Sequence, residues 1–270
     1  MAVKSNGIAI DFSKIPYHIR LRKEDVGTIA IIVGDSGRVP VVASYLKRSR
    51  QIGSNREFLT YSGYVGENKT IVISTGIGGP AAAIVVEELA RLGIKTIIRV
   101  GTCGSLHKNI GMGTLVIAEA SVRLDGTTKQ YVMDGYPAAA TPELSVDLKN
   151  ASKSLGKPFA SGIVASTDAF YAGEGHGSFS RHEAMSSRTI KNDMKTANVI
   201  AFEMETSTLF VLGRLFGIST GAVLSVVDVI TESEKNKFNL KAGINDAIIV
   251  AIGAIKEYSK NKPIDIKPLI

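Results

Sequence analysis

At the centre of the chain lies Thr96-Ile97-Ile98-Arg99-Val100-Gly101-Thr102-Cys103-Gly104, where a β-branched apolar run passes into small residues. Residues 96–100 are almost continuously apolar, which is typical of a central strand covered on both faces. We expect this strand to end at Val100 and a glycine-rich turn to follow it. An arginine at the end of a buried strand is unfavourable unless an anion meets it. The same run therefore marks a candidate binding site at Arg99.

The rest of the chain alternates strand-like and helix-like segments. The expected strands are 28–33, 70–74, 96–100, 114–120, 159–166 and 220–227, and the expected helices are 38–47, 81–92, 143–155, 206–216 and 241–257. This alternation predicts the α/β class, as a three-layer α/β/α sandwich around a mixed, mostly parallel sheet. No linker rich in proline or glycine divides the chain, so we expect a single domain over 1–270. The polar stretch 173–198 is expected to be an irregular flap.

Composition narrows the class of protein. The chain has 270 residues, of which 44% are hydrophobic, enough for a sizeable core. Its net charge of +7 would be compatible with binding to nucleic acid. The basic residues are dispersed and tryptophan is absent, however, so an anionic small-molecule substrate is favoured. The single cysteine, Cys103, favours a reducing compartment. We find no signal-type or membrane-spanning apolar stretch and expect a cytoplasmic protein with no membrane partner.

Three arginines stand beside small residues and backbone amides. Arg38 closes the turn Gly34-Asp35-Ser36-Gly37-Arg38, Arg56 lies between Asn55 and Glu57, and Arg99 ends the central strand. Such groups favour one small oxyanion, with phosphate the best candidate.

Other side chains suggest the rest of a ligand. Glu203 and Glu205 are suited to the hydroxyls of a sugar, and Phe170 with Tyr171 could form a wall for a flat ring. In α/β sheets ligands bind beyond the carboxyl ends of the strands, where all these motifs fall. The four histidines lack metal-ligand spacing, so no metal is expected.

Each of these residues also has a simpler interpretation. Arg99 could pair with a buried carboxylate, and Arg56 could be a surface residue. Glu203 and Glu205 could be ordinary acids at a helix N-terminus, favoured by the helix dipole. Phe170 could belong to the core. Their agreement on one edge of the sheet argues more strongly for a site than any one motif.

Several short motifs occur in the order found in nucleoside phosphorylases of the hexameric type. The chain resembles that family, and most closely its uridine phosphorylases. The motifs that carry the resemblance are 34–38, 74–80, 99–104, 123–126, 166–171 and 203–205.

The resemblance implies reversible phosphorolysis of uridine, or a related pyrimidine nucleoside, to free base and ribose 1-phosphate. Inorganic phosphate would be a co-substrate, and no cofactor is implied. The implied phosphate-binding residues are Gly34, Arg38, Arg56, Arg99 and Thr102. The implied ribose-binding residues are His18, Thr102, Met204 and Glu205. The implied base-binding residues are Phe170, Glu174, His176 and Ile230. A homo-hexamer of dimers is also implied, with Arg56 and His18 reaching into a neighbouring subunit's site.

The base-reading segment departs from the family pattern. Gly173-Glu174-Gly175-His176 stands where the family has Gly-Gln-x-Arg. An ionised glutamate only accepts, so Glu174 would take a proton from uracil N3, or from N1 and the amine of guanine, while His176 would donate to a carbonyl. Asp228 resembles the aspartate that purine nucleoside phosphorylases use near purine N7, although it could merely cap the next turn. A purine nucleoside phosphorylase for guanosine or inosine, with Asp228 as acid, therefore stays open.

The catalytic candidates are Arg99, Asp228, Glu174 and His176. Phosphate held by arginines would stabilise positive charge on the ribose ring and bond to C1′, while the groups around the base would offset its negative charge. A nucleosidase that uses water, or a non-catalytic anion-binding protein, fits the three arginines less well.

Overall fold

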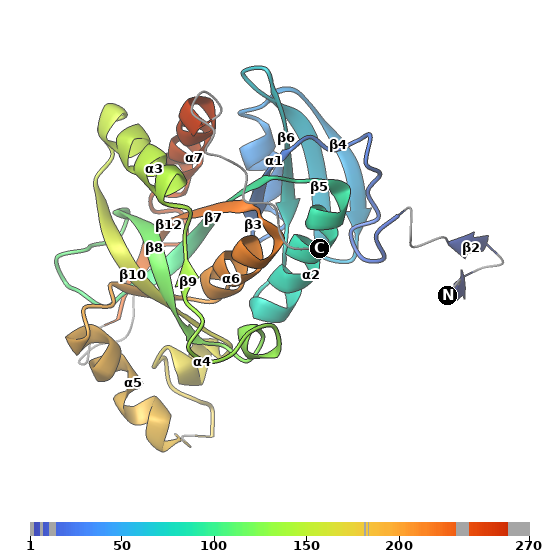
Figure 1. Cartoon of the computed structure of the whole chain (residues 1–270). Coiled ribbons are helices and arrows are strands. Elements are labelled where there is room, and N and C mark those ends of the chain that lie inside the picture. Colours follow the sequence, from blue (N-terminus) through green and yellow to red (C-terminus); the bar gives the residue numbers. More distant parts are fainter. Residues whose placement is uncertain are drawn as a thin grey trace.

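The computed structural model describes residues 3–5, 8–10, 15–180, 182, 184–230 and 238–258. Its framework is a ten-stranded mixed sheet in the order β11-β10-β8-β12-β7-β3-β6-β5-β4, with β9 paired to β8 (Figure 1). The strands of this sheet are β3 (Ile29–Val33), β4 (Lys47–Asn55), β5 (Phe58–Val65), β6 (Asn68–Ser74), β7 (Thr96–Ser105), β8 (Leu115–Leu124), β9 (Ala138–Ala139), β10 (Phe159–Thr167), β11 (Ala201–Glu203) and β12 (Ser219–Val229). A separate two-stranded sheet pairs β1 (Val3–Ser5) with β2 (Ile8–Ile10).

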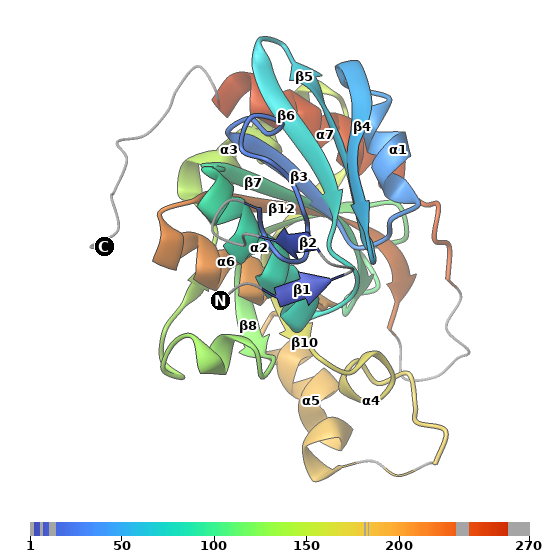
Figure 2. The same cartoon turned by 90° about the vertical axis from the view of Figure 1, so that its right-hand side faces the viewer.

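Helices cover both faces of the sheet. They are α1 (Arg38–Ala43), α2 (Gly79–Leu92), η1 (Thr128–Gln130, a 3₁₀ helix), α3 (Pro142–Ser154), α4 (Phe170–Gly173), α5 (Met185–Thr196), α6 (Thr206–Phe216) and α7 (Ile244–Tyr258). Alternate residues of β7 show the two layers, because Ile97 packs in the core under α2 and α6 while Ile98 packs in the core under α1, α3 and α7. Figures 1 and 2 show α2 beside α6, and α3 beside α7. These layers confirm the expected α/β class.

One half of the sheet closes on itself. Strand β11 pairs in parallel with β10 and antiparallel with β7, so β7, β12, β8, β10 and β11 form a ring. The ring brings the carboxyl end of β7 beside β11, where Phe202 lies opposite Gly104. Segments far apart in the sequence therefore meet at one place.

The glycines after Val100 do not form the expected turn. That prediction is wrong, because β7 continues through them to Ser105. Gly101 is needed for close packing instead, since a Cβ there would lie 2.8 Å from Arg99 Cζ and 2.9 Å from Leu224 Cδ2. The glycine leaves the space that the Arg99 side chain occupies along the same face of the strand.

Two other expectations need correction. The helix expected over 38–47 ends at Ala43, and the chain returns to the sheet as β4 at Lys47. This strand carries a run of exposed charged residues because it lies at the edge of the sheet, where charges oppose pairing with another chain. The stretch 173–198 is not wholly irregular, since it contains helix α5.

Candidate active site at the ends of the central strands

A cavity of about 670 Å³ lies beyond the carboxyl ends of β3, β6, β7, β11 and β12. Of the residues expected in the site, the cavity is lined by Gly34, Arg38, Arg99, Thr102, Phe170, Glu174, His176, Met204, Glu205 and Asp228. The sheet therefore brings together most of the site that the motifs indicate.

Arg99 is buried at the floor of the cavity, with a side chain only 5% exposed. Its Nε donates to Glu203 Oε2 at 3.2 Å, and its Nη2 lies 2.5 Å from Glu205 Oε2. Burial alone would lower the pKa of Arg99, but the charges of Glu205 and Glu203 outweigh it and raise that pKa. The pairing with buried carboxylates, which the sequence left as an alternative, is therefore present within the cavity itself.

Glu203 and Glu205 both lie just before α6, and the Thr206 amide at the start of that helix donates to Glu203, so the interpretation as acids at a helix N-terminus also holds. Glu205 occupies the N-cap position, and its Oε1 accepts a hydrogen bond from the Gly78 amide at 2.5 Å. Burial raises the pKa of Glu205, in opposition to Arg99, which lowers it. The Arg99–Glu205 pair thus presents a cation and an anion side by side to a ligand.

Arg38 begins helix α1, directly after the turn that follows β3. Its Nε lies 3.8 Å from Asp35 Oδ2, and Asp35 in turn accepts a hydrogen bond from the Gly37 amide at 2.8 Å. Burial lowers the pKa of Arg38, with Asp35 opposing that shift and Arg99 adding to it. The turn therefore aims a second arginine toward the position of Arg99.

Aromatic and titratable side chains line another part of the cavity. The His176 ring stacks on Phe170 with centroids 4.4 Å apart, and Phe238 lies 5.5 Å from His176. His176 Nε2 is 3.3 Å from Glu174 Oε2. Burial raises the pKa of Glu174, while His176 acts to lower it. Phe238 follows a stretch of polar sequence and carries no sequence signal of its own, so the motifs missed it.

Asp228 ends the buried part of β12 and is 2% exposed. Among the described residues its Oδ2 has no hydrogen-bond partner. Burial raises the pKa of Asp228, and His176 opposes the shift. A buried carboxyl oxygen without a protein partner is a candidate to meet a ligand atom.

Three of the expected residues do not line this cavity. His18 lies in a separate depression beside α2, where its Nδ1 is 2.8 Å from Glu88 Oε1. Arg56 has a positive φ of 53° and stands 6.0 Å from the centre of the Tyr17 ring. Ile230 packs against Gly104 so closely that a Cβ added to Gly104 would lie 2.8 Å from Ile230 Cδ1.

Cys103 also lines the cavity but is 3% exposed. Burial, first of all, raises the pKa of this thiol far above its usual value. The thiolate needed for a nucleophile is therefore scarce at neutral pH.

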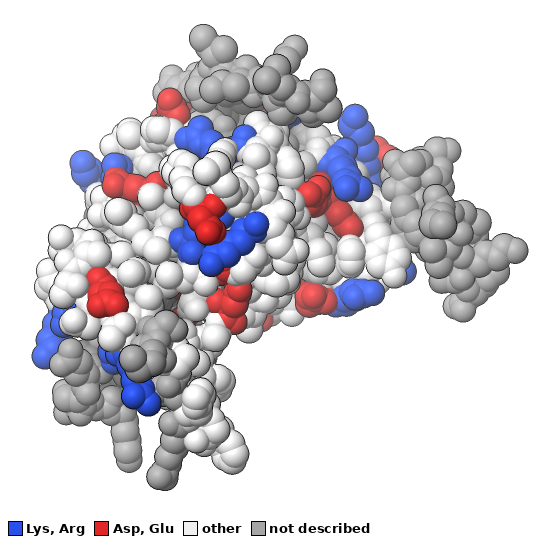
Figure 3. Space-filling model, turned by 60° about the horizontal axis from the view of Figure 1, so that its bottom comes forward, with Lys and Arg blue, Asp and Glu red and all other residues white. Residues whose placement is uncertain are grey.

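Within the described ranges, no group of three or more His, Cys, Asp and Glu side chains suited to a metal occurs. None of the helices described is both long and apolar enough to cross a membrane. On the face shown in Figure 3, basic and acidic side chains are interspersed.

The sequence of this chain is similar to those of known phosphorylases. The family model of the phosphorylase superfamily matches residues 28–256. The chain is 41% identical over 240 residues to a uridine phosphorylase of Thermococcus kodakarensis, covering 89% of this chain and 85% of that protein. It is 34% identical over 249 residues to the uridine phosphorylase of Escherichia coli, covering 89% of this chain and 96% of that protein. A guanosine phosphorylase of Halorubrum lacusprofundi is 37% identical over 210 residues, covering 77% of this chain and 81% of that protein.

Proposed function

From the premise that this chain belongs to the phosphorylase superfamily, we propose that it is a nucleoside phosphorylase that cleaves uridine. The reaction is the reversible conversion of uridine and inorganic phosphate to uracil and ribose 1-phosphate. One observation carries the proposal. A single cavity presents Arg38, Arg99 and Glu205 together with the stacked pair Phe170 and His176. The two arginines suit an oxyanion, Glu205 suits a sugar diol, and the stacked pair suits a flat ring.

Arg38 and Arg99 hold the phosphate, with the Gly34 and Thr102 backbone beside them. Glu205 accepts from the ribose hydroxyls, and Met204 packs against the sugar. As the bond from C1′ to the base breaks, the base leaves with its electron pair and positive charge builds on the ribose. Phosphate next to C1′ stabilises that charge and then forms the new C–O bond. The arginines therefore act by placing the nucleophile, without a covalent enzyme intermediate.

On the base, Phe170 stacks against the ring, His176 donates to a carbonyl oxygen, and Glu174 accepts from uracil N3–H. The 3.3 Å contact between His176 and Glu174 supports this arrangement, because it holds a donor and an acceptor side by side. A donor at the carbonyl also offsets the charge that the departing base acquires.

Asp228 favours a second candidate function, cleavage of guanosine or inosine. Its Oδ2 lacks a partner within the described part of the chain, and its raised pKa favours the protonated form that donates a hydrogen bond. A protonated Asp228 would donate to purine N7, and Glu174 would accept from N1 and the amine of guanine. The similarity to a guanosine phosphorylase agrees with this candidate.

The test is release of free base from uridine, inosine, guanosine and adenosine, each with and without phosphate. Cleavage of uridine only with phosphate supports the first function. Phosphate-dependent cleavage of guanosine or inosine alone replaces it with the second. Cleavage without phosphate would mean a nucleosidase, and no cleavage at all would contradict both.

The assembly proposed is a homo-hexamer with sites shared between subunits. His18 and Arg56 support it, since neither lines the cavity of its own chain. Each would reach the ribose or phosphate of a neighbour. Sedimentation of a monomer that retains full activity would contradict the sharing. The single buried Cys103 fits an enzyme of the cytoplasm.

A further inference from the structure

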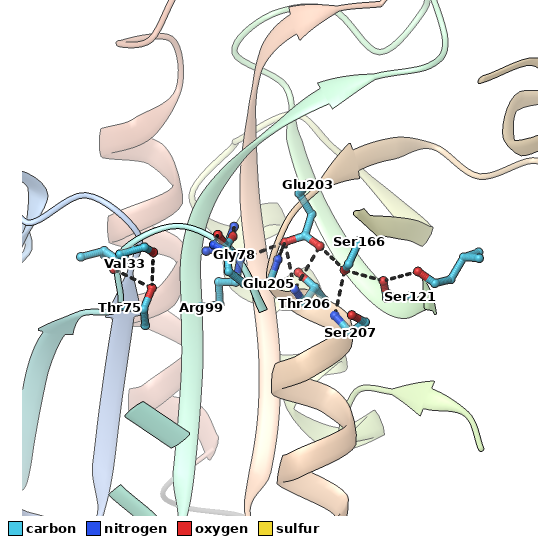
Figure 4. A network of polar contacts seen from close by, with 12 residues as sticks. Val33, Thr75, Gly78, Arg99, Ser121, Ser166, Glu203, Glu205, Thr206 and Ser207 are labelled. Atoms are coloured by element: carbon cyan, nitrogen blue, oxygen red, sulfur yellow. Dashed lines mark hydrogen bonds and ion pairs between the residues drawn. The ribbon is translucent and has the colours of Figure 1, made fainter. Parts of the chain in front are cut away.

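The Glu203 carboxylate joins four elements of the fold. Its side chain has no exposed surface, although the residue borders the cavity. Oε2 accepts from Arg99 Nε of β7 at 3.2 Å and from the Glu205 amide at 3.0 Å. The Thr206 amide at the start of α6 donates to both oxygens at 3.0 Å, and Ser166 of β10 donates to Oε1 (Figure 4). The acceptor positions of this carboxylate are thus taken up by the protein.

Glu205 differs from Glu203 in this respect. Its Oε2 pairs with Arg99 Nη2, and its Oε1 accepts from the Gly78 amide, with no further hydrogen bond to Glu205 Oε1 found within the described residues. A carboxylate accepts about four hydrogen bonds. Glu205 therefore keeps acceptor capacity for a ligand, whereas Glu203 is occupied by protein donors.

We propose that Glu203 is a positioning residue, which sets the orientation of the Arg99 guanidinium relative to Glu205. The bond to Nε fixes rotation about the last bonds of the arginine side chain, so that its Nη groups point toward the phosphate. The same carboxylate holds the amides of Glu205 and Thr206. It therefore fixes the distance between the phosphate-binding arginine and the ribose-binding glutamate. The inference rests on the proposed function of the cavity.

Two substitutions separate position from charge. Glu203→Asp keeps the negative charge but withdraws the carboxylate by one methylene from Arg99 Nε. Glu203→Gln removes the charge but keeps the length. Its amide oxygen can still accept from Arg99, and its NH₂ can donate to Ser166, whose oxygen has lone pairs and whose proton can go to Ser121 Oγ at 2.8 Å. A positioning role predicts damage from Asp and rescue by Gln.

The measurements are the phosphate KM, the uridine KM and kcat, together with the phosphate Kd by calorimetry. For Glu203→Asp we expect the phosphate KM and Kd to rise about 10- to 100-fold, as for loss of a charge-assisted hydrogen bond. We expect the uridine KM to change much less. For Glu203→Gln we expect phosphate constants within about threefold of the wild type. Thermal unfolding of each variant shows that it is folded.

Ser166→Ala gives a second test, in which the Glu203→Gln background matters. Alone it removes one donor from a carboxylate with several others, and we expect a small change in the phosphate Kd. Combined with Glu203→Gln it leaves the amide NH₂ without an acceptor, so we expect a loss larger than the sum of the single effects. Ser152→Ala is the matched control, because Ser152 is a buried serine of α3 whose hydroxyl has no partner within the described residues.

Two results would overturn the inference. The first is normal phosphate binding in Glu203→Asp; if phosphate binding changes in Glu203→Gln at the same time, charge alone matters. The second is an equal loss in all constants together with unfolding, which means a purely structural role. Failure of the proposed function is distinct from these, because it removes turnover in the wild type while the phosphate Kd values still decide the role of Glu203.

Discussion

Gly101→Ala tests the packing that holds Arg99 in place. The new methyl would lie 2.8 Å from Arg99 Cζ and Nη2 and 2.9 Å from Leu224 Cδ2. Atoms of this kind pack at about 3.5–4.0 Å, so something must move by roughly 1 Å. Leu224 is fully buried and Arg99 is held by two carboxylates, so neither gives way easily. We expect the arginine to shift along the face of β7, because the cavity offers it room.

The two expected effects have different sizes. Overpacking of a buried strand costs about 1–3 kcal/mol, which lowers Tm by about 2–12 °C in a protein of this size. Displacing a group that places the nucleophile by about 1 Å lowers kcat/KM about 100-fold, or about 2.7 kcal/mol. The variant should therefore stay folded below its lowered Tm while it loses most of its phosphorolysis.

The assay is steady-state release of uracil at a temperature well below Tm, with a thermal melt of the same sample. Gly135→Ala is the matched control, because a Cβ at Gly135 meets no atom within 4 Å. We expect this control to match the wild type. A Gly101→Ala enzyme whose kcat/KM stays within about threefold of the wild type would refute the reasoning, since Arg99 could then tolerate a shift of that size.

The remaining predictions concern buried charges and the thiol. Arg99→Ala should abolish phosphate-dependent turnover and lower the free energy of unfolding by about 3–5 kcal/mol, because it leaves Glu203 and Glu205 without their cation. Burial already raises the pKa of Glu205, so the loss of stability in Arg99→Ala should shrink as pH falls and that carboxyl takes up a proton. Denaturant unfolding of wild type and variant at low and neutral pH measures this loss. An equal loss at both pH values would contradict the expectation. Glu174→Gln should raise the ratio of kcat/KM for uridine to kcat/KM for guanosine about fivefold, because an amide can also donate to a carbonyl of the base. Competing-substrate assays measure this ratio. An unchanged ratio would place base recognition elsewhere. Cys103 should resist iodoacetamide in the native protein and react after unfolding, as counted by mass spectrometry, and rapid native labelling would mean that the thiol is exposed or ionised.

The elements with clear start and stop signals could be predicted from the sequence. Helix α6 has the bounds expected for it and ends at Gly217 with φ of 64°, as its glycine stop indicates. The end of β7 could not be predicted, because glycine serves both turns and close packing. At Gly101 the packing partner is Leu224 of β12, which is the neighbouring strand in the sheet but lies far away in the sequence. The ring closure by β11 was equally hidden, since three residues carry no period that identifies their partners.

The cavity shows a similar division. Arg99 could be singled out because a charged residue at a strand end is unusual. Arg38 could be singled out by the glycine-containing turn before it, and Glu205 by the second carboxylate two residues earlier. The separate task of Glu203 could not, because two glutamates in one short segment differ only in the donors that the fold brings to them. No residue near His18 indicates that it lies away from the cavity of its own chain, and only the family resemblance implied that it reaches a neighbouring subunit.

The closed ring of strands has a consequence for how the chain folds. Arg99 and Glu203 are 104 residues apart in sequence, and Gly78 and Glu205 are 127 residues apart. Bringing such distant segments together requires closure of long loops, which makes these contacts slow to form. Helices α2 and α6, by contrast, depend mainly on local hydrogen bonds. After dilution from denaturant, the helical circular dichroism should therefore recover first, and phosphate binding should return only when the last strand of the ring has docked.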